Sequence, residues 1–237
     1  MTDPATAPTP QPTSTPTSAR EEILARVRAA LGDVVPEAAD ASPVVPPRAT
    51  PATHEGAHAA LVDLFDERVA DYRAVVERCT AAELEERIAA ALPVQGRVVV
   101  PAGLDVHVPR AVVDDPSPDA TSDASDTAGQ AGVLSAAELD ACVAVVTAAR
   151  VGVAETGTIV LDHTPDQGRR AITLVPDLHV CIVRADQVVA DVPDAVELLD
   201  PARPLTWISG PSATSDIELD RVEGVHGPRT LHVLLVD

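Results

Sequence analysis

The sequence predicts an α/β fold, and three observations lead to that prediction. Segments with helical spacing of apolar residues alternate with short Val-rich runs along most of the 237 residues. The run Arg-Val-Val-Val-Pro at 97–101 is apolar at its centre, which is typical of a strand covered on both faces, as in parallel sheets. The C-terminal part, 205–237, consists of an apolar run, a hydroxyl-rich loop, a turn and a second apolar run, which indicates strand, loop and strand.

Composition excludes several classes of function. The chain has 17 basic and 37 acidic residues and a formal net charge of −20, so nucleic acids and anionic membrane surfaces are not expected partners. All basic residues are Arg, and Lys and Asn are both absent, which excludes a Schiff-base lysine and a P-loop. With one Trp, one Tyr and one Phe, the sequence offers no aromatic platform for stacking bases or a flavin.

The cysteine pattern does not predict a metal cluster. Cys79, Cys142 and Cys181 are far apart and form no CxxC pair, so they indicate neither an iron–sulfur cluster, nor structural zinc, nor a disulfide framework. The first residues lack the basic and apolar segments of a secretory signal, and no apolar run is long enough to span a membrane. We therefore expect a cytoplasmic protein whose thiols pack as small apolar side chains.

The chain is expected to have three parts. Residues 1–17 are rich in Pro and Thr and should form a disordered tail, because they contain too little apolar surface to offset the entropy of ordering. Residues 18–52 comprise a helical arm with one apolar face and a Pro-rich linker. Residues 53–237 should form the α/β domain, in which 114–132 is a mobile acidic insert.

Apolar residues at helical spacing predict one long amphipathic helix over 53–79. Its first turn carries His54-Glu55-Gly56-Ala57-His58, which matches the zincin pattern H-E-x-x-H, and Glu77 or Glu83 would be a formal third ligand. The motif follows a Pro-rich linker and contains Gly, which gives metal ligands poor support. We favour an ordinary solvent-facing helix start and predict no metal site.

Capping boxes mark two further helix starts, at Thr80 with Glu83 and at Ser135 with Glu138. The remaining predicted elements are two strands flanking a turn within 142–162, strands at 172–175 and 178–183, and a helix over 186–199. His179 lies inside one of these apolar strands and is expected to be a core side chain with its hydrogen bonds satisfied.

A polar break, Glu155-Thr156-Gly157-Thr158, interrupts an apolar segment and is the first candidate for a site. A carboxylate buried between apolar runs costs free energy unless it is hydrogen-bonded or used, so Glu155 is a candidate catalytic residue. The alternative is an exposed position at a strand bend. The loop 162–170 that follows ends in two Arg residues, which face either an anionic ligand or solvent.

The hydroxyl-rich loop after 205–208 is the second candidate. Ser212, Thr214 and Asp216 offer hydroxyls, a carboxylate and nearby backbone N–H groups at the exit of a strand, where open α/β folds bind ligands. The alternative is a helix start, with Ser215 as the N-cap and Glu218 completing a capping box.

Three motifs resemble a known family. SGPSATSDIE at 209–218, GVHGPR at 224–229 and AETGTIVLD at 154–162 occur in the order and spacing of the lactate utilization protein C family, the LUD-domain proteins. The chain resembles this family from about Ala59 to its C-terminus, with the tail and the acidic insert outside the resemblance. Ala213 stands where the commoner family form has a basic or polar side chain, so an anion contact from that position is in doubt.

The resemblance implies a three-layer α/β/α fold similar to ribose-phosphate isomerases, glucosamine-phosphate isomerases and CoA transferases. It also implies a part in oxidising L-lactate to pyruvate beside two partner proteins, one rich in iron–sulfur cysteines and one with paired cysteine-rich domains. Lactate oxidation moves two electrons, and this sequence has no thiolate cluster, dinucleotide fingerprint or flavin platform to accept them. We expect a non-redox subunit that binds no cofactor itself, with iron–sulfur clusters on the partners.

The expected ligand of such a subunit is the carboxylate of a small hydroxy or keto acid. His226 would exchange a proton and Arg229 would clamp the carboxylate, unless they are a turn histidine and a surface charge. The candidate catalytic residues are Glu155 and His226, and the candidate substrate-binding residues are Thr156, Gly157, Thr158, Gly210, Ser212, Thr214, Asp216 and Arg229.

Two other functions stay open at this point. The step Glu155-Thr156-Gly157 looks like the glutamate turn of CoA transferases, in which the carboxylate is the acyl-accepting nucleophile. The alternative is thus a stand-alone CoA-transferase-like or sugar-phosphate-isomerase-like enzyme. A pure assembly factor would instead contact its partners through the helix at 18–31.

Overall fold

The computed structural model describes residues 19–32, 55–116, 132–214, 222–223 and 226–237. The chain divides into two units, Met1–Pro51 and Ala52–Asp237. In the first unit the described helix is α1 (Ala19–Ala30), where Ile23 and Val27 are exposed. The expected tail and linker lie outside the described residues, as do residues 117–131 of the acidic insert, whereas Asp114, the first residue of that insert, is buried at the end of a strand.

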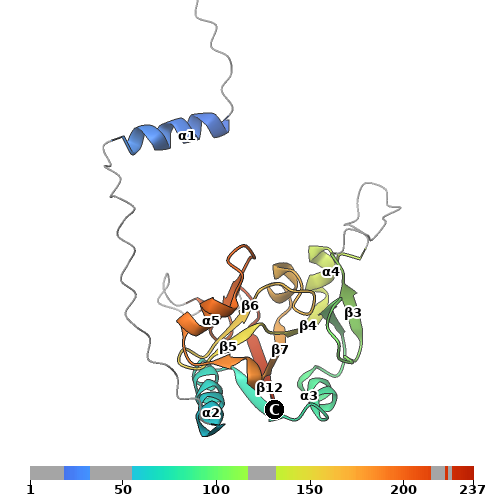
Figure 1. Cartoon of the computed structure of the whole chain (residues 1–237). Coiled ribbons are helices and arrows are strands. Elements are labelled where there is room, and N and C mark those ends of the chain that lie inside the picture. The colour runs from blue at the N-terminus through green and yellow to red at the C-terminus, as the bar shows by residue number, and fades with distance from the viewer. Residues whose placement is uncertain (1–18, 33–54, 117–131, 215–221, 224–225) are drawn as a thin grey trace, which may run out of the picture. The chain divides into compact units, whose positions relative to one another are not determined.

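The centre of the second unit is a six-stranded sheet in which every neighbouring pair of strands is parallel (Figure 1). The strand order is β1-β12-β7-β4-β2-β3. The strands are β1 (Val75–Cys79), β2 (Arg97–Pro101), β3 (Ala111–Asp114), β4 (Cys142–Ala148), β7 (Leu178–Arg184) and β12 (Thr230–Val236). All residues of β2 after Arg97 are buried, so the strand predicted from the Val run is confirmed.

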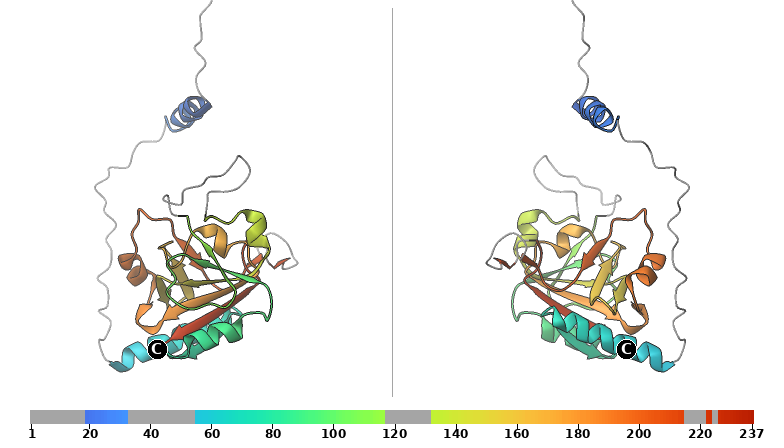
Figure 2. Two further views of the ribbon diagram at one scale, coloured as in Figure 1. Left: turned by 90° about the vertical axis from the view of Figure 1, so that its right-hand side faces the viewer. Right: turned by 90° about the vertical axis from the view of Figure 1, so that its left-hand side faces the viewer.

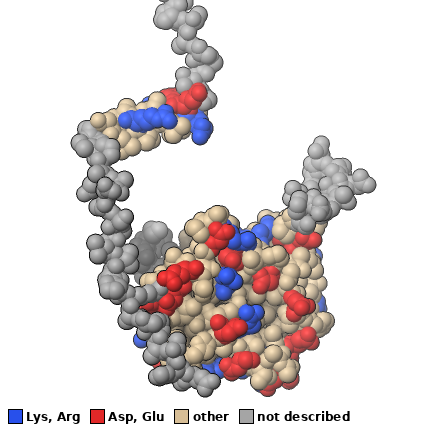
Figure 3. All heavy atoms as spheres, viewed as in Figure 1, with Lys and Arg blue, Asp and Glu red and all other residues tan. Residues whose placement is uncertain are grey.

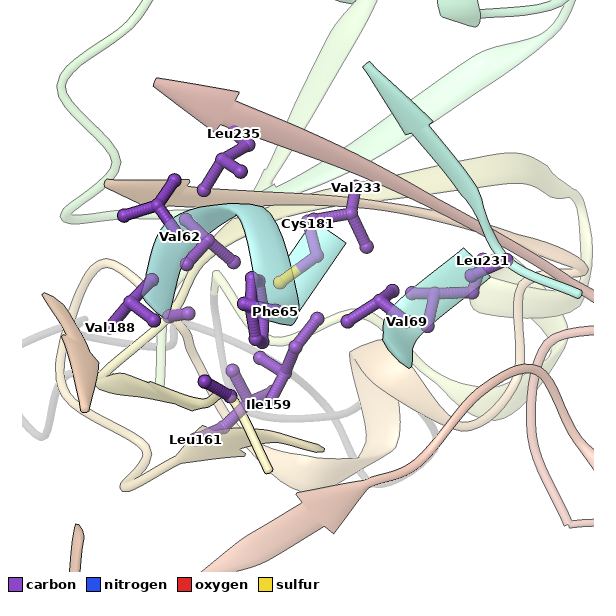
Figure 4. Packing of buried hydrophobic residues seen from close by; sticks show 14 residues of the cluster. Val62, Phe65, Val69, Ile159, Leu161, Cys181, Val188, Leu231, Val233 and Leu235 are labelled. Carbon is purple, nitrogen blue, oxygen red and sulfur yellow. The ribbon is translucent and has the colours of Figure 1, made fainter. Parts of the chain in front are cut away.

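Helices cover both faces of this sheet. On one face α3 (Leu84–Ala91) packs through Ile88, in a cluster with Val180 and Leu234. On the other face α2 (Glu55–Asp71) packs through Phe65, which is fully buried in a cluster that includes Val233 (Figure 4). Figure 1 shows the two helices on either side of β12. The α/β prediction is confirmed.

A second, four-stranded sheet packs beside α2, and the sequence did not predict it. Its order is β8-β5-β6-β9, with β8 (Val188–Val189), β5 (Val151–Val153), β6 (Thr158–Leu161) and β9 (Thr206–Ile208). Ile159 and Leu161 join the α2 cluster, whereas Val160 packs with Ala195 of α5 (Val192–Leu198) on the opposite face. Figure 2 shows the β5–β6 hairpin and α5 as successive layers on one side of the large sheet.

The predicted helix over 53–79 is wrong in its C-terminal part. α2 ends at Asp71, the chain turns through Arg73, which has a left-handed φ of 68°, and β1 begins at Val75. Val75 and Val76 continue the helical spacing, but β-branched side chains favour a strand once a partner is available, and β12 pairs with them in parallel.

Three shorter predictions also need correction. Segment 142–162 contains three strands, because β4 belongs to the large sheet while β5 and β6 form a hairpin in the small one. Segment 172–175 is not a strand. A 3-10 turn, η1 (Arg170–Thr173), buries Ile172 against the large sheet, because β7 already pairs with β4 and β12 and leaves no free edge there.

The predicted helix over 186–199 is also wrong in its first half. The segment contains η2 (Ala185–Gln187), then β8, then α5. The helix starts late because the Asp191 side chain accepts a hydrogen bond from the Asp194 N–H and Pro193 stands in its first turn, so both residues favour a helix start at this point.

The two capping boxes differ in outcome. Ser135 and Glu138 form a complete box at the start of α4 (Ala136–Asp140), as predicted. Thr80 and Glu83 make the expected side-chain contacts, but α3 begins only at Leu84, so they close a turn ahead of the helix.

Within the described segments, no helix has the length and apolar character needed to cross a membrane.

Candidate functional site

A pocket of about 140 Å³ lies between the two sheets, at the start of β7 and β12. Its walls are β9 with the loop 209–212, the turn 226–228, and η1. Its floor is formed by His179 and Leu231, which are early residues of the two central parallel strands. The polar side chains among its lining residues are Arg170, Thr173, His179, Thr206, Ser209, Ser212 and His226.

The loop and the turn that form the outer wall are held by specific contacts. Gly210 has a left-handed φ of 83°, and a Cβ atom there would lie 2.6 Å from the Tyr72 Cβ, so the loop approaches α2 as only Gly allows. The Ser212 N–H donates to the Pro228 carbonyl at 2.8 Å, and the His226 N–H donates to Ser212 Oγ at 3.1 Å. These contacts hold the loop and the turn against each other.

Arg170 supplies the positive charge of the pocket. Its Nη1 donates to Thr173 Oγ1 at 3.1 Å, and no carboxylate of the described residues forms an ion pair with it. Burial lowers the pKa of its guanidinium, but an Arg stays protonated in proteins. A partly desolvated guanidinium without a carboxylate partner among the described residues favours the binding of an anion.

His179 supplies a neutral imidazole. Only 2% of its surface is exposed, and its Nε2 lies 2.8 Å from Thr147 Oγ1. Burial, and secondarily the charge of Arg170, lowers the pKa of His179 to about 4, so the ring is uncharged near neutral pH. The expectation of a satisfied core histidine holds for Nε2, yet the same side chain also lines the pocket.

A row of hydroxyls connects the pocket wall to the β5–β6 turn. Ser209 Oγ, in the wall, lies 2.8 Å from Thr158 Oγ1, and Thr156 Oγ1 donates to Thr158 Oγ1 at the same distance. Thr158 is buried. Thr156 and Thr158, both predicted site residues, thus reach the pocket only through Ser209.

The structure brings together one part of the predicted site and separates the other. Gly210, Ser212 and His226 line the pocket. Glu155 does not line it, because its side chain is exposed in the turn between β5 and β6, which is the alternative position considered from the sequence. Gly157 has a φ of 57° and packs against the Arg68 backbone. Glu155 and Ser212, both candidate site residues, therefore do not line the same pocket.

The other predicted residues have different positions. Arg229 is exposed and forms two hydrogen bonds of 2.6 Å with the Asp177 carboxylate, so its guanidinium is directed away from the pocket lining. Thr214 belongs to the short strand β10 (Ala213–Thr214), which pairs with β11 (Val222–Glu223). Asp216 and the alternative helix start at Ser215 and Glu218 lie outside the described residues.

One residue of the pocket, Arg170, had a signal in the sequence that did not identify it. The loop 162–170 ends in Arg169 and Arg170, and the sequence could not assign them different roles. Arg169 binds the buried Asp114 carboxylate, whereas Arg170 lines the pocket.

The position of the pocket is also unexpected, because it lies at the amino ends of β7 and β12 and not at the carboxyl ends where open α/β folds bind ligands.

A second pocket, of about 660 Å³, has Arg170 in common with the first. Its other charged lining residues include Asp114, Arg169 and Arg203, and each of the three already has a partner in the structure: Asp114 and Arg169 bind each other, and Arg203 Nε donates to the Asp162 carbonyl at 2.9 Å. Arg170 is therefore the charged group that both pockets can offer to a ligand.

The zincin-like motif does not form a metal site among the described residues. His58 Nε2 lies 3.1 Å from the Ala185 carbonyl oxygen, and His54 is outside the described segments. In the part of the chain that the structure describes, no three His, Cys, Asp or Glu side chains come together as metal ligands.

The fold and the pocket define an α/β protein with a parallel central sheet and a small pocket lined by Arg170. Residues 57–236 match the LUD domain family, and the chain belongs to that family. The resemblance predicted from the three motifs is confirmed.

Individual relatives agree with this assignment. A protein from Deinococcus radiodurans named lactate utilization protein C is 45% identical over 222 residues, covering 92% of this chain and 95% of the relative. A Bacillus subtilis protein of the same name is 34% identical over 101 residues, covering 39% of this chain and 41% of that protein. The crystal structure of a DUF162 family protein from Deinococcus radiodurans has a TM-score of 0.59 and 41% identity, covering 76% of this chain and 98% of that one.

Proposed function

We propose that this chain is a non-redox subunit of an L-lactate oxidation system, and that it binds lactate or pyruvate in the Arg170 pocket beside iron–sulfur and cysteine-rich-domain partner proteins. The observation that carries the proposal is the Arg170 guanidinium, which is partly desolvated, lines a pocket and has no carboxylate partner among the described residues. The relatives are named lactate utilization protein C, and these names support lactate as the compound that is consumed.

The size and lining of the pocket suit a small acid. Its volume of about 140 Å³ is below the roughly 300 to 1,000 Å³ of sites for drug-sized ligands. Arg170 can bind a carboxylate through two parallel N–H···O bonds, and Thr173, Ser209 and Ser212 offer hydroxyls to the remaining oxygen atoms. A three-carbon hydroxy or keto acid has this distribution of polar groups.

The positions of the thiols support a division of labour with partners. Conversion of lactate to pyruvate releases two electrons and two protons, and thiolate-bound clusters need several sulfur ligands at one place. Cys181, Cys79 and Cys142 belong to three different buried clusters, so their sulfur atoms do not converge. In this proposal the electrons pass to clusters on the partners, and this chain binds the organic acid.

Isothermal titration of the purified chain with L-lactate and pyruvate tests the ligand. We expect binding of both acids, and an Arg170→Gln variant should weaken it about tenfold to a hundredfold, because a charge-assisted hydrogen bond is lost. Arg184→Gln is the matched control, since Arg184 is exposed and pairs with Asp186. Absence of heat with both acids would overturn the proposal. If Arg229→Gln weakened binding as much as Arg170→Gln, Arg229 would bind the carboxylate, as predicted from the sequence.

Co-purification tests the partners. The tagged chain, expressed with iron–sulfur and cysteine-rich-domain proteins encoded next to its own gene, should retain them, and the purified assembly should oxidise L-lactate. The Arg170→Gln variant should assemble equally well but oxidise lactate poorly, because the change affects the pocket and leaves the rest of the surface intact. Lactate oxidation by the partners without this chain would contradict its role.

A further inference from the structure

The imidazole of His179 has one ring nitrogen that no described residue uses. Nε2 is bound to Thr147 Oγ1 at 2.8 Å, and no hydrogen bond joins Nδ1 to another described group. Only 2% of the His179 surface is exposed, and His179 lines the pocket that Arg170 also lines. Nδ1 is not one of the fully buried side-chain atoms that lack a partner among the described residues, so it is open to solvent, and a ligand atom in the pocket can bind it.

Thr147 allows this nitrogen to be either a donor or an acceptor. Thr147 is fully buried on β4, its Oγ1 lies 2.8 Å from His179 Nε2, and Cys181 is its register partner on β7. A hydroxyl has one proton and two lone pairs, so Thr147 can either donate to Nε2 or accept from Nε2–H. Both arrangements keep the hydrogen bond to His179.

The two arrangements give Nδ1 opposite hydrogen-bonding roles in the pocket. If Thr147 donates to Nε2, the proton of the neutral ring is on Nδ1, which then donates to an oxygen in the pocket. If Nε2 donates to Thr147, Nδ1 has a free lone pair and accepts a hydrogen bond from the ligand. Burial raises the pKa of the Cys181 thiol to about 12 and lowers that of His179 to about 4, so both groups are neutral at physiological pH and the exchange needs no ionisation.

We infer that His179 recognises the oxygen on carbon 2 of a bound carboxylic acid, donating to the keto oxygen of a 2-keto acid or accepting from the hydroxyl of a 2-hydroxy acid. The inference rests on the proposed function, because Arg170 must hold the carboxylate for the 2-oxygen to reach His179. The ligand class is therefore 2-oxygenated short carboxylic acids in both oxidation states. Thr147 is a positioning residue that acts through His179.

Competing acids of nearly equal size test the inference. Titration with L-lactate, pyruvate, propionate and 3-hydroxypropionate should show that the first two bind about tenfold or more tightly than the last two, which lack an oxygen on carbon 2. All four should lose affinity in Arg170→Gln. If propionate binds as tightly as lactate and depends on Arg170, the inference about His179 fails but the carboxylate site is supported. If none of the four acids binds, the inference and the proposed carboxylate site both fail.

Two variants separate a positioning role from a purely structural one. Thr147→Val keeps the shape of the side chain but removes the hydroxyl, and it should reduce the preference for pyruvate over propionate by about threefold or more. Thr147→Ser keeps the hydroxyl and should restore the preference. An equal loss of preference in the Val and Ser variants would overturn the role of Thr147.

Nitrogen-15 NMR of the unaltered protein gives a measurement that does not depend on a variant's stability. The imidazole signals of His179 are assigned by their loss in His179→Gln. With pyruvate bound, the proton should be on Nδ1, because a keto oxygen can only accept. A bound-state spectrum with the proton on Nε2 and Nδ1 unprotonated would contradict the inference.

Discussion

Asp114 is a fully buried carboxylate with partners for both of its oxygen atoms. Arg169 donates to it through Nε and Nη2, each at 2.8 Å, and the Leu134 N–H donates to Oδ1 at 2.9 Å. Arg169 Nη2 also donates to the Leu134 carbonyl. The ion pair therefore joins the end of β3, the segment before α4 and the loop before η1.

We predict that Asp114→Ala lowers the free energy of unfolding by about 3 to 5 kcal/mol, because removing one partner of a buried pair leaves the other charge uncompensated. Urea denaturation monitored by circular dichroism measures the change. Asp186→Ala is the control: Asp186 pairs with Arg184 on the surface, and such pairs contribute about 0 to 1 kcal/mol. Equal losses in the two variants would contradict the assigned role of Asp114.

His179 should make stability depend on pH in a defined window. Its folded pKa of about 4 is below the ordinary value of 6.5, so between these values the unfolded chain binds a proton that the folded chain does not. The stabilisation from neutral His179 is complete above pH 6.5 and is lost as the pH falls toward 4. The slope approaches about 1.4 kcal/mol per pH unit.

We predict that the difference in unfolding free energy between the unaltered protein and His179→Gln narrows by about 2 to 3 kcal/mol between pH 7 and pH 4.5. Comparing the two proteins at each pH removes the contribution of the carboxylates, which titrate in both. A difference that stays constant over this range would show that His179 keeps an ordinary pKa in the folded state.

At the scale of elements, three glycines of other segments pack closely against α2 and the turn directly after it. A Cβ atom at Gly152 would lie 2.9 Å from the Phe65 ring, one at Gly157 would lie 2.6 Å from the Arg68 carbonyl carbon, and one at Gly210 would lie 2.6 Å from the Tyr72 Cβ. Residues 65, 68 and 72 follow each other at helical spacing. The helix thus positions the β5–β6 hairpin and the pocket loop together.

We predict that Gly157→Ala lowers the unfolding free energy by about 2 to 4 kcal/mol, from a strained left-handed φ and from overpacking against the Arg68 backbone. Thermal denaturation measures the effect. Glu155→Ala is the control in the same turn, because Glu155 is exposed and such substitutions usually change stability by about 0.5 kcal/mol or less. A neutral Gly157→Ala would contradict the close approach of the turn to α2.

At the scale of the whole molecule, stability resides in the second unit. Every buried hydrophobic residue of the described segments lies between Val62 and Val236. Charged side chains of both signs are interspersed on the face of this unit seen in Figure 3, and ion pairs between exposed side chains contribute little individually. The clusters on both faces of the large sheet and around the small sheet therefore dominate the folding free energy.

We predict that a chain beginning at Ala52 unfolds within about 2 °C of the full-length protein, since 1 kcal/mol corresponds to roughly 2 to 4 °C for a domain of this size. Differential scanning calorimetry measures the transition, and titration with pyruvate shows whether the pocket is retained. A drop of 10 °C or more would show that residues 1–51 take part in the folded core. It would contradict the division into two units.

Local patterns predicted the elements that depend on local physics. The Val run of β2, the apolar strands β7 and β12 and the capping box at Ser135 were correct, because burial on both faces and cap geometry leave a signal within a few residues. The motifs in the C-terminal part also identified the family and three residues that line the pocket, Gly210, Ser212 and His226.

Long-range contacts decided the rest. The sequence alone determined that this is an α/β chain of the LUD-domain family with a hydroxyl-rich C-terminal loop. The tertiary structure decided that Val75 starts a strand beside β12, that Glu155 faces solvent, and that Arg169 binds Asp114 while Arg170 lines the pocket. The physical reason is that hydrophobic spacing reports which residues avoid water, whereas the partner of a strand edge or a guanidinium is set by residues distant in the chain.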